Sequence, residues 1–234
     1  MEIQKSCIFD PKRYEFCSQP SFYRHNRRIY NIDLPYEMYK TTKKMNPTTS
    51  TPAPKLTYAD YCLIPEDGNR HEIIDGDHYV SPAPIYYHQQ IIARLLVKLF
   101  TFVDVQKLGS VAAAPVDVIL SDHSVVQPDL LFISADRTSI ITPKNVQGAP
   151  DLLIEVLSEF NRRQDEVVKR RLYEQFSVKE YWVVDPELEI VKIYRLTDGQ
   201  YGKPYMLMRD NDDVLVSDLL HGFKCDLAEI FIPL

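Results

Sequence analysis

The sequence predicts one α/β (α+β) domain in which helices cover a mixed sheet. Strand-like and helix-like patterns alternate from residue 55 onward, which favours this class. The composition, 45% hydrophobic and 26% charged, is typical of globular proteins. A length of 234 residues suits one sizeable core. No apolar run approaches the roughly 18 to 20 residues that a membrane helix needs, so we expect no membrane partner.

Charge divides the chain into an extension, a linker and a domain. Residues 1–44 carry a net charge of +4, whereas the remaining residues carry −10. We predict a poorly ordered basic extension at 1–44, a Pro/Thr-rich linker at 45–54 and a folded domain at 55–234. A nucleic-acid-binding arm is the alternative reading of the extension. Translation that begins at Met45 is a third.

The first part of the domain predicts a short helix, a hairpin and a long helix. Thr57 is the expected N-cap of the short helix. The strands 70–74 and 78–81 flank Asp75-Gly76, a dipeptide typical of tight hairpins. From residue 84 to about 103, apolar residues recur with a period near 3.6, which predicts a helix.

The rest of the domain predicts further strands and one more helix. Apolar runs, a helical period and turn residues define them. In chain order we expect strands at 115–120, 125–133 and 151–157, a helix at 162–176, a strand at 180–185, and a hairpin formed by 189–196 and 201–208.

Two carboxylates interrupt strands that should be apolar. Asp129 lies in the run 125–133, and Glu155 lies in the run 151–157. Burying an isolated carboxylate costs several kcal/mol unless it is paired, protonated or bound to a metal. With alternating side chains, Glu155 shares a face with Leu153, and Asp129 shares a face with Gln127. If the strands are neighbours, the two acids converge on a spot that suits Mg²⁺.

The helix after Glu155 carries a lysine on its apolar face. Leu172 and Phe176 help to define that face. Asp165 and Lys169 fall on it, and Lys169 lies one turn before Tyr173. A lysine directed inward needs a carboxylate or a phosphate as its partner. The alternative is an i, i+4 pair of Asp165 and Lys169 at the helix edge, which contributes about 0.3 kcal/mol.

Three further features allow weaker inferences. Glu72 alternates along the first hairpin strand and is either a third acid at the same spot or a solvent-facing residue. His88 is in phase with Ile92, so a hydrogen-bonded core histidine is favoured over a catalytic one. The four cysteines form no C-x-x-C pair, which favours free thiols and a cytoplasmic protein.

Five motifs in order resemble the Uma-two family of the PD-(D/E)XK nuclease superfamily. The resemblance covers about residue 56 to the C-terminus, and the order of the motifs makes it specific. It implies a restriction-endonuclease-like core and Mg²⁺-dependent hydrolysis of DNA, with Mn²⁺ as an expected substitute. The motifs are RHEIIDG at 70–76, VQPDL at 126–130, APDLLIEVLS at 149–158, the segment from Asp165 through Lys169 to Tyr173, and EYWVVDP at 180–186.

The resemblance assigns roles to individual residues. Asp129 is the aspartate of the Pro-Asp motif, and Glu155 is the acid of the E-x-K motif. The usual lysine of the superfamily falls on Leu157, so Lys169 in the next helix becomes the candidate. Glu72 resembles an additional upstream acid. The segment 159–161 and Ser177 also depart from the family pattern, and neither is a proposed ligand.

The expected mechanism follows from these roles. Asp129, Glu155 and the backbone carbonyl of Val156 hold Mg²⁺, and Glu72 binds a second metal or orients a water. Lys169 orients or deprotonates the attacking water and offsets the charge of the phosphate. The auxiliary candidates are His88, Gln127, Asp165 and Tyr173. The expected DNA contacts are Arg162, Arg163, Arg170 and Arg171. The alternative is that these arginines form an ordinary solvated helix face.

Two other functions compete with the nuclease. The first is a catalytically weak or inactive nuclease fold that binds nucleic acid or serves in assembly, which the acidic pI of about 5.5 favours slightly. The second is a metal-free scaffold, which requires Glu155 to be neutral or paired with Lys169. A homodimer is expected only by analogy with other nucleases of this fold.

Overall fold

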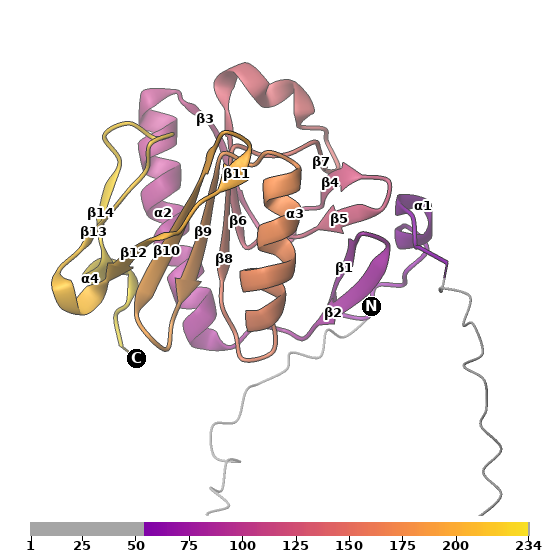
Figure 1. Ribbon diagram of the computed structural model, residues 1–234, viewed down its shortest axis with the longest axis horizontal. Helices are drawn as coiled ribbons and strands as arrows, with labels where there is room; N and C mark the ends of the chain where they lie inside the picture. Colours follow the sequence, from indigo (N-terminus) through magenta and orange to yellow (C-terminus); the bar gives the residue numbers. More distant parts are fainter. Residues whose placement is uncertain (1–53, 234) are drawn as a thin grey trace, which may run out of the picture. The chain divides into compact units, whose positions relative to one another are not determined.

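The computed structural model describes residues 54–233 (Figure 1). The predicted extension and most of the linker lie outside the described residues. The described part holds a seven-stranded sheet, a five-stranded sheet and a two-stranded sheet. It contains no helix that is both long and apolar enough to cross a membrane.

The elements follow one another in an order close to the predicted one. They are α1 (Tyr58–Tyr61), β1 (Arg70–Ile74), β2 (Asp77–Ser81), α2 (Tyr86–Gln106), β3 (Gly109–Ala113), β4 (Val118–Ser121), β5 (Ser124–Val126), β6 (Leu130–Ser134), a 3₁₀ helix (Ala135–Ile140), β7 (Val146–Gln147), β8 (Leu152–Val156), a π-helix (Gln164–Lys169), α3 (Arg170–Gln175), β9 (Glu180–Asp185), β10 (Ile190–Thr197), β11 (Gln200–Tyr201), β12 (Tyr205–Met208), a 3₁₀ turn (Arg209–Asn211), β13 (Val214–Val216), β14 (Lys224–Asp226) and α4 (Leu227–Ile230).

The seven-stranded sheet separates two apolar clusters. Its strand order is β11-β10-β9-β8-β6-β3, with β12 also paired to β10. Strands β8 and β9 are parallel, whereas β6 and β8 are antiparallel. Helix α2 covers one face of the sheet, and α3 lies on the other side (Figure 1). Alternate residues of β8 therefore face different clusters: Ile154 packs on the α2 side and Leu153 on the α3 side.

The expected strand 125–133 is wrong as a single element. It is two strands, β5 and β6, which belong to different sheets. Gln127, Pro128 and Asp129 lie between them. Proline has no N–H to donate to a sheet, so Pro128 is a physical reason for the break. The break brings the five-stranded sheet, which includes β1, next to the start of β6.

The other differences lie mainly in short strands. The expected strand 115–120 starts only at Val118, and the expected strand 201–208 is divided into β11 and β12. Strands β3, β7, β13 and β14 and helix α4 carry no strong pattern and were not predicted. The expected helix 162–176 begins with a π-helix from Gln164 to Lys169. The cap of α1 is confirmed, because Thr57 and Asp60 form a capping box.

Candidate active site

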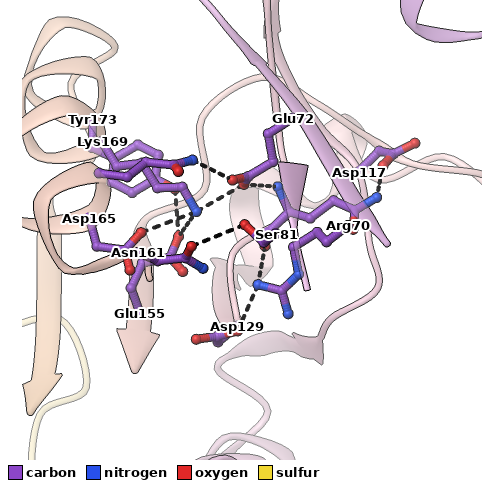
Figure 2. Close-up of polar contacts among 12 residues, drawn as sticks. Arg70, Glu72, Ser81, Asp117, Asp129, Glu155, Asn161, Asp165, Lys169 and Tyr173 are labelled. Atoms are coloured by element: carbon purple, nitrogen blue, oxygen red, sulfur yellow. Dashed lines mark hydrogen bonds and ion pairs between the residues drawn. The ribbon is translucent and has the colours of Figure 1, made fainter. Parts of the chain in front are cut away.

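Asp129 and Glu155 lie on the same face of neighbouring strands. β6 and β8 pair with Leu130 opposite Ile154, so Asp129 and Glu155 fall one residue beyond that pair. Both side chains are buried, with 2% and 1% of their residue surfaces exposed. Leu131 and Leu153, on the same faces, belong to one apolar cluster. The predicted convergence of the two acids is confirmed (Figure 2).

Donors surround the carboxylate of Asp129. The backbone N–H of Val156 donates to Oδ2 at 2.8 Å, and Arg70 Nη1 donates to Oδ1 at 2.9 Å. His88 Nε2 lies 3.4 Å from Oδ2. Burial alone would raise the pKa of Asp129, but the contact with His88 and the charge of Arg70 lower it to about 2. Asp129 is therefore ionised at neutral pH.

Lys169 lies inside a group of three carboxylates. Its Nζ is 2.9 Å from Glu155 Oε1 and 2.9 Å from Glu72 Oε1. Asp165 Oδ1 is 3.4 Å from the same Nζ, and Asp165 lies four residues before Lys169. Only 2% of Lys169 is exposed, and burial opposes its charge, but Glu155 and Glu72 raise its pKa well above the usual value. The inward lysine is confirmed. The i, i+4 pair of Asp165 and Lys169 also forms, but it is buried, so its expected position at the helix edge is wrong.

The pKa of Glu155 is raised above its usual value. Burial raises its pKa, and the nearby charges of Asp129 and Glu72 add to this effect against the pull of Lys169. The resulting pKa is about 7. Tyr173, one turn after Lys169, donates its hydroxyl to Glu155 Oε1 at 2.9 Å. The side chain of Glu155 is thus held by two donors on one of its oxygens.

Glu72 is buried and fully engaged, so the solvent-facing alternative is wrong. It is 1% exposed and reaches the site from β1. The backbone N–H of Gln127 donates to Oε1 at 2.8 Å, and Gln164 Nε2 donates to Oε2 at 2.9 Å. Lys169 is a third neighbour of Glu72, so Glu72 holds the lysine in place. Both oxygens of Glu72 have hydrogen-bond partners, as do both oxygens of Asp129.

His88 reaches the same place from α2. Its Nε2 lies 2.7 Å from the carbonyl oxygen of Val156, so this nitrogen carries the proton and donates it to the carbonyl. The other ring nitrogen, Nδ1, is buried and has no hydrogen-bond partner among the described residues. His88 is thus a hydrogen-bonded core histidine, as favoured, and it contacts two of the predicted metal ligands.

Several site residues escaped the sequence reasoning. Arg70 lies two residues before Glu72 on the same face of β1, and that spacing was the available signal. Gln164 contacts Glu72 from the π-helix, and the sequence pattern contains no signal of a π-helix. Gln127, by contrast, was an auxiliary candidate, and its Nε2 donates to the hydroxyl of Tyr61 in α1 and to Oδ1 of Asp117, which directly precedes β4.

The predicted arginine cluster is not gathered at the site. Arg162 forms ion pairs with Asp185 and Glu187. Arg170 lies over the ring of Tyr194 at 5.7 Å, and its Nε donates to a main-chain carbonyl. The other two cluster members, Arg163 and Arg171, are exposed. Of the four predicted DNA contacts, only these last two present their side chains openly to solvent.

The donor set of the site fits a magnesium ion. Four carboxylates face two permanent cations, so two of the carboxylates need a further cation or a proton for balance. Burial favours the proton at two of them, because it raises the pKa of Glu155 to about 7 and that of Asp165 well above its usual value. Asp165 Oδ1 is buried without a hydrogen-bond partner, and Glu155 Oε2 accepts no hydrogen bond from the described residues. Among the described residues, no three His, Cys, Asp or Glu side chains are placed so that they could hold a metal ion together, so side chains would supply at most two carboxylate ligands. Two carboxylates, a carbonyl and waters are the ligands that Mg²⁺ commonly takes. The carboxylates are Glu72, Asp129, Glu155 and Asp165, and the cations are Arg70 and Lys169.

Comparisons with known proteins identify the fold and the family of the chain. A crystal structure from Anabaena variabilis, described as a "putative nuclease belonging to DUF820", superposes with a TM-score of 0.65 at 18% identity, over 75% of this chain and 97% of that one. This likeness shows a shared fold, in agreement with the predicted restriction-endonuclease-like core. No curated protein matches the chain. The model of the Uma2 family, described as "Putative restriction endonuclease", matches residues 57–228. The chain therefore belongs to the Uma2 family.

Proposed function

We propose that the protein is a Mg²⁺-dependent endonuclease that hydrolyses DNA phosphodiester bonds. One observation carries the proposal: Asp129 and Glu155 enter one buried spot from adjacent strands, and the cluster around them has more carboxylates than cations. Such an excess is costly in an apolar interior unless a cation or protons balance it. Membership of the Uma2 family supports a nuclease as the class of enzyme.

The side chains divide the work between binding and positioning. Asp129, Glu155 and the carbonyl of Val156 would hold Mg²⁺ or Mn²⁺. When bound, the ion supplies an acidic water and neutralises charge that develops on the phosphate. Lys169 holds Glu155 in place and keeps its own proton, because its pKa is raised. Glu72 fixes Lys169 from the opposite side, so its role is that of a positioning residue, not of a metal ligand.

Cleavage of plasmid and linear DNA tests this function. We expect nicking with Mg²⁺ or Mn²⁺ and none with a chelator. Glu155→Gln keeps the shape of the side chain and removes its charge, so we expect it to abolish nicking. Glu159→Gln, at an exposed position four residues away, is the matched control and should cut normally. Equal nicking by the wild type and Glu155→Gln would contradict the assigned site.

A nuclease fold that binds nucleic acid without cutting it is the second candidate. It is favoured by the ion pairs of Lys169 with Glu72 and Glu155, which neutralise part of the cluster without a metal. This candidate predicts DNA binding with no cleavage and no rise of Tm on adding Mg²⁺. The nuclease predicts both cleavage and a higher Tm, because an ion that binds the folded state stabilises it.

Two further expectations concern the cellular context. A homodimer is proposed by analogy with other nucleases, and sedimentation of the full chain measures its mass directly. A cytoplasmic location is proposed from the cysteines. Two of these, Cys62 and Cys225, are described, and both are free thiols. Fractionation of the cells in which the protein is expressed tests that location.

A further inference from the structure

Arg70 occupies the site with only part of its guanidinium engaged. Its Nη1 donates to Asp129 Oδ1 at 2.9 Å and to the carbonyl oxygen of Gln127 at 3.2 Å. Its Nε and Nη2 donate to no group among the described residues. Neither of them is among the fully buried polar atoms that lack a partner, so neither is fully enclosed by the protein. The side chain is 19% exposed. One nitrogen of the guanidinium thus binds the site, and the exposed part of the side chain is assigned to the Nε–Nη2 edge, which has no protein partner.

Lys169 cannot present a comparable edge. It is 2% exposed, and three carboxylates surround its ammonium group. To reach a substrate phosphate it would have to leave buried acids that depend on it, at a cost of several kcal/mol. Among the described cations that contact the carboxylates of the site, Arg70 is therefore the one with donors free for a ligand from solvent.

A guanidinium is suited to this double contact. Its five N–H donors form a rigid, planar fork, so one edge can bind a carboxylate while the other binds two phosphate oxygens. The two hydrogen bonds of Nη1, to Asp129 Oδ1 (Figure 2) and to the carbonyl oxygen of Gln127, together orient the guanidinium. Burial opposes the charge of Arg70, but Asp129, Glu155 and Glu72 outweigh burial and raise its pKa above the usual value, so the guanidinium stays protonated. Fixed geometry and an open charged edge are the features of a preorganised phosphate site.

We propose that Arg70 is a catalytic residue that binds the non-bridging oxygens of the scissile phosphate through Nε and Nη2. Arg70 then offsets the charge of the substrate, a role that the sequence had assigned to Lys169. This inference rests on the proposed nuclease function and names the group that meets its substrate. The two cations of the site then have different roles: Arg70 binds the substrate, and Lys169 positions the acids.

The dependence of DNA binding on salt tests the proposal without requiring cleavage. Loss of one phosphate contact reduces the slope of log K against log salt concentration by about 0.9 for duplex DNA. We would measure this slope with a fluorescent duplex in Ca²⁺ buffer, checking that the DNA stays intact. The slope measured for Arg70→Met should be smaller than the wild-type slope by about 0.9. Arg137→Met is the matched control, because Arg137 also binds a buried aspartate, Asp151, at 2.8 Å.

A second pair of variants separates an effect on DNA binding from an effect on folding. Arg70→Met leaves Asp129 buried without its arginine, so the Asp129→Asn single variant is compared with the double variant Asp129→Asn/Arg70→Met. The slope should again differ by about one phosphate contact. A purely structural role of Arg70 would change the free energy of unfolding and leave the slope unchanged. Arg70→Lys keeps one charge but loses the fork, so its slope should stay near that of the wild type while cleavage falls at least tenfold.

The outcomes separate the two proposals. A reduced slope in both Arg70→Met backgrounds, with Arg137→Met unchanged, supports the phosphate contact. Unchanged slopes, or a wild type that binds no DNA, overturn it. A wild type that binds DNA with the predicted slope difference but does not hydrolyse it in Mg²⁺ overturns the nuclease function and leaves the contact of Arg70 standing.

Discussion

The backbone amide of Val156 donates a hydrogen bond to Asp129 Oδ2 at 2.8 Å. This bond joins the two motifs of the site, because Val156 directly follows Glu155 on β8 and Asp129 directly precedes β6. The Asp129 carboxylate is therefore oriented by the main chain of the strand that carries the second acid. A ligand set built on two paired strands keeps its geometry before any metal or substrate binds.

Replacing Lys169 with methionine should destabilise the fold. The change removes the cation from a buried group of three carboxylates, and breaking a buried ion pair on one side costs about 3 to 5 kcal/mol. Urea denaturation measures this loss. Lys179→Met is the control, since Lys179 is half exposed in its pair with Asp151 and should cost less than about 1 kcal/mol. Equal losses in the two variants would contradict the buried role of Lys169.

Replacing Tyr173 with phenylalanine should weaken metal binding. Its hydroxyl orients Glu155, and loss of a partner that orients a metal ligand commonly costs 10- to 100-fold in affinity. We therefore expect about a tenfold rise in the Kd for Mn²⁺ by calorimetry. Tyr181→Phe is a close control, because the Tyr181 hydroxyl is also buried but donates to the main-chain oxygen of Asp165. A similar change in both variants would count against the assignment.

The arginines that the sequence predicts as DNA contacts should differ in their effects on DNA binding. Arg163 and Arg171 are exposed, so Arg163→Ala and Arg171→Ala should lower DNA affinity and the salt slope if the helix faces the DNA backbone. Arg162→Ala should instead lower the Tm, because Arg162 is paired with Asp185, which is fully buried. DNA titrations and melting curves compare the three variants. No loss of affinity in the first two would exclude this helix from the interface.

Asp151 should contribute a stability that depends on pH. Burial raises its pKa, but Lys179, Ser134 and Arg137 outweigh burial and lower it to about 2. A carboxylate with a lowered pKa stabilises the fold above its unfolded pKa, and this stability is lost as the pH falls towards 2. Asp151→Asn should therefore cost about 2 kcal/mol at pH 7 and progressively less below pH 4.

The control for that change is Asp136→Asn. Asp136 is an exposed neighbour on the same 3₁₀ helix as Arg137, and its substitution should leave the free energy of unfolding nearly unchanged at every pH. Denaturation at several pH values compares the two variants. A loss for Asp151→Asn that stays constant from pH 7 to pH 3 would show that its charge is not what stabilises the fold.

The sequence predicted the central acids because they break a physical rule. A carboxylate in an apolar strand stands out, and alternation along the strand then places Asp129 and Glu155 on matching faces. The same reasoning found Lys169 on the apolar face of its helix. These residues are visible because local pattern and burial disagree, which is common at functional sites.

The residues that sequence reasoning missed depend on contacts between distant parts of the chain. Arg70 looks like an ordinary charged residue at the start of a strand, and its partner Asp129 lies 59 positions away. Gln164 faces Glu72 from a π-helix, whose i→i+5 pattern leaves no period in the sequence. The break at Pro128 was detectable, because proline interrupts strand pairing, but the apolar residues on both sides outweighed it.

The position of a bound cation tests the central claim most directly. Crystals of the wild-type protein soaked in Mn²⁺ should show one anomalous peak bonded to oxygens of Asp129 and Glu155. The same soak of Glu155→Gln crystals should show no peak there. An anomalous peak elsewhere, or an ordered wild-type site in which Lys169 remains the only cation beside Glu155 at saturating Mn²⁺, would contradict the account.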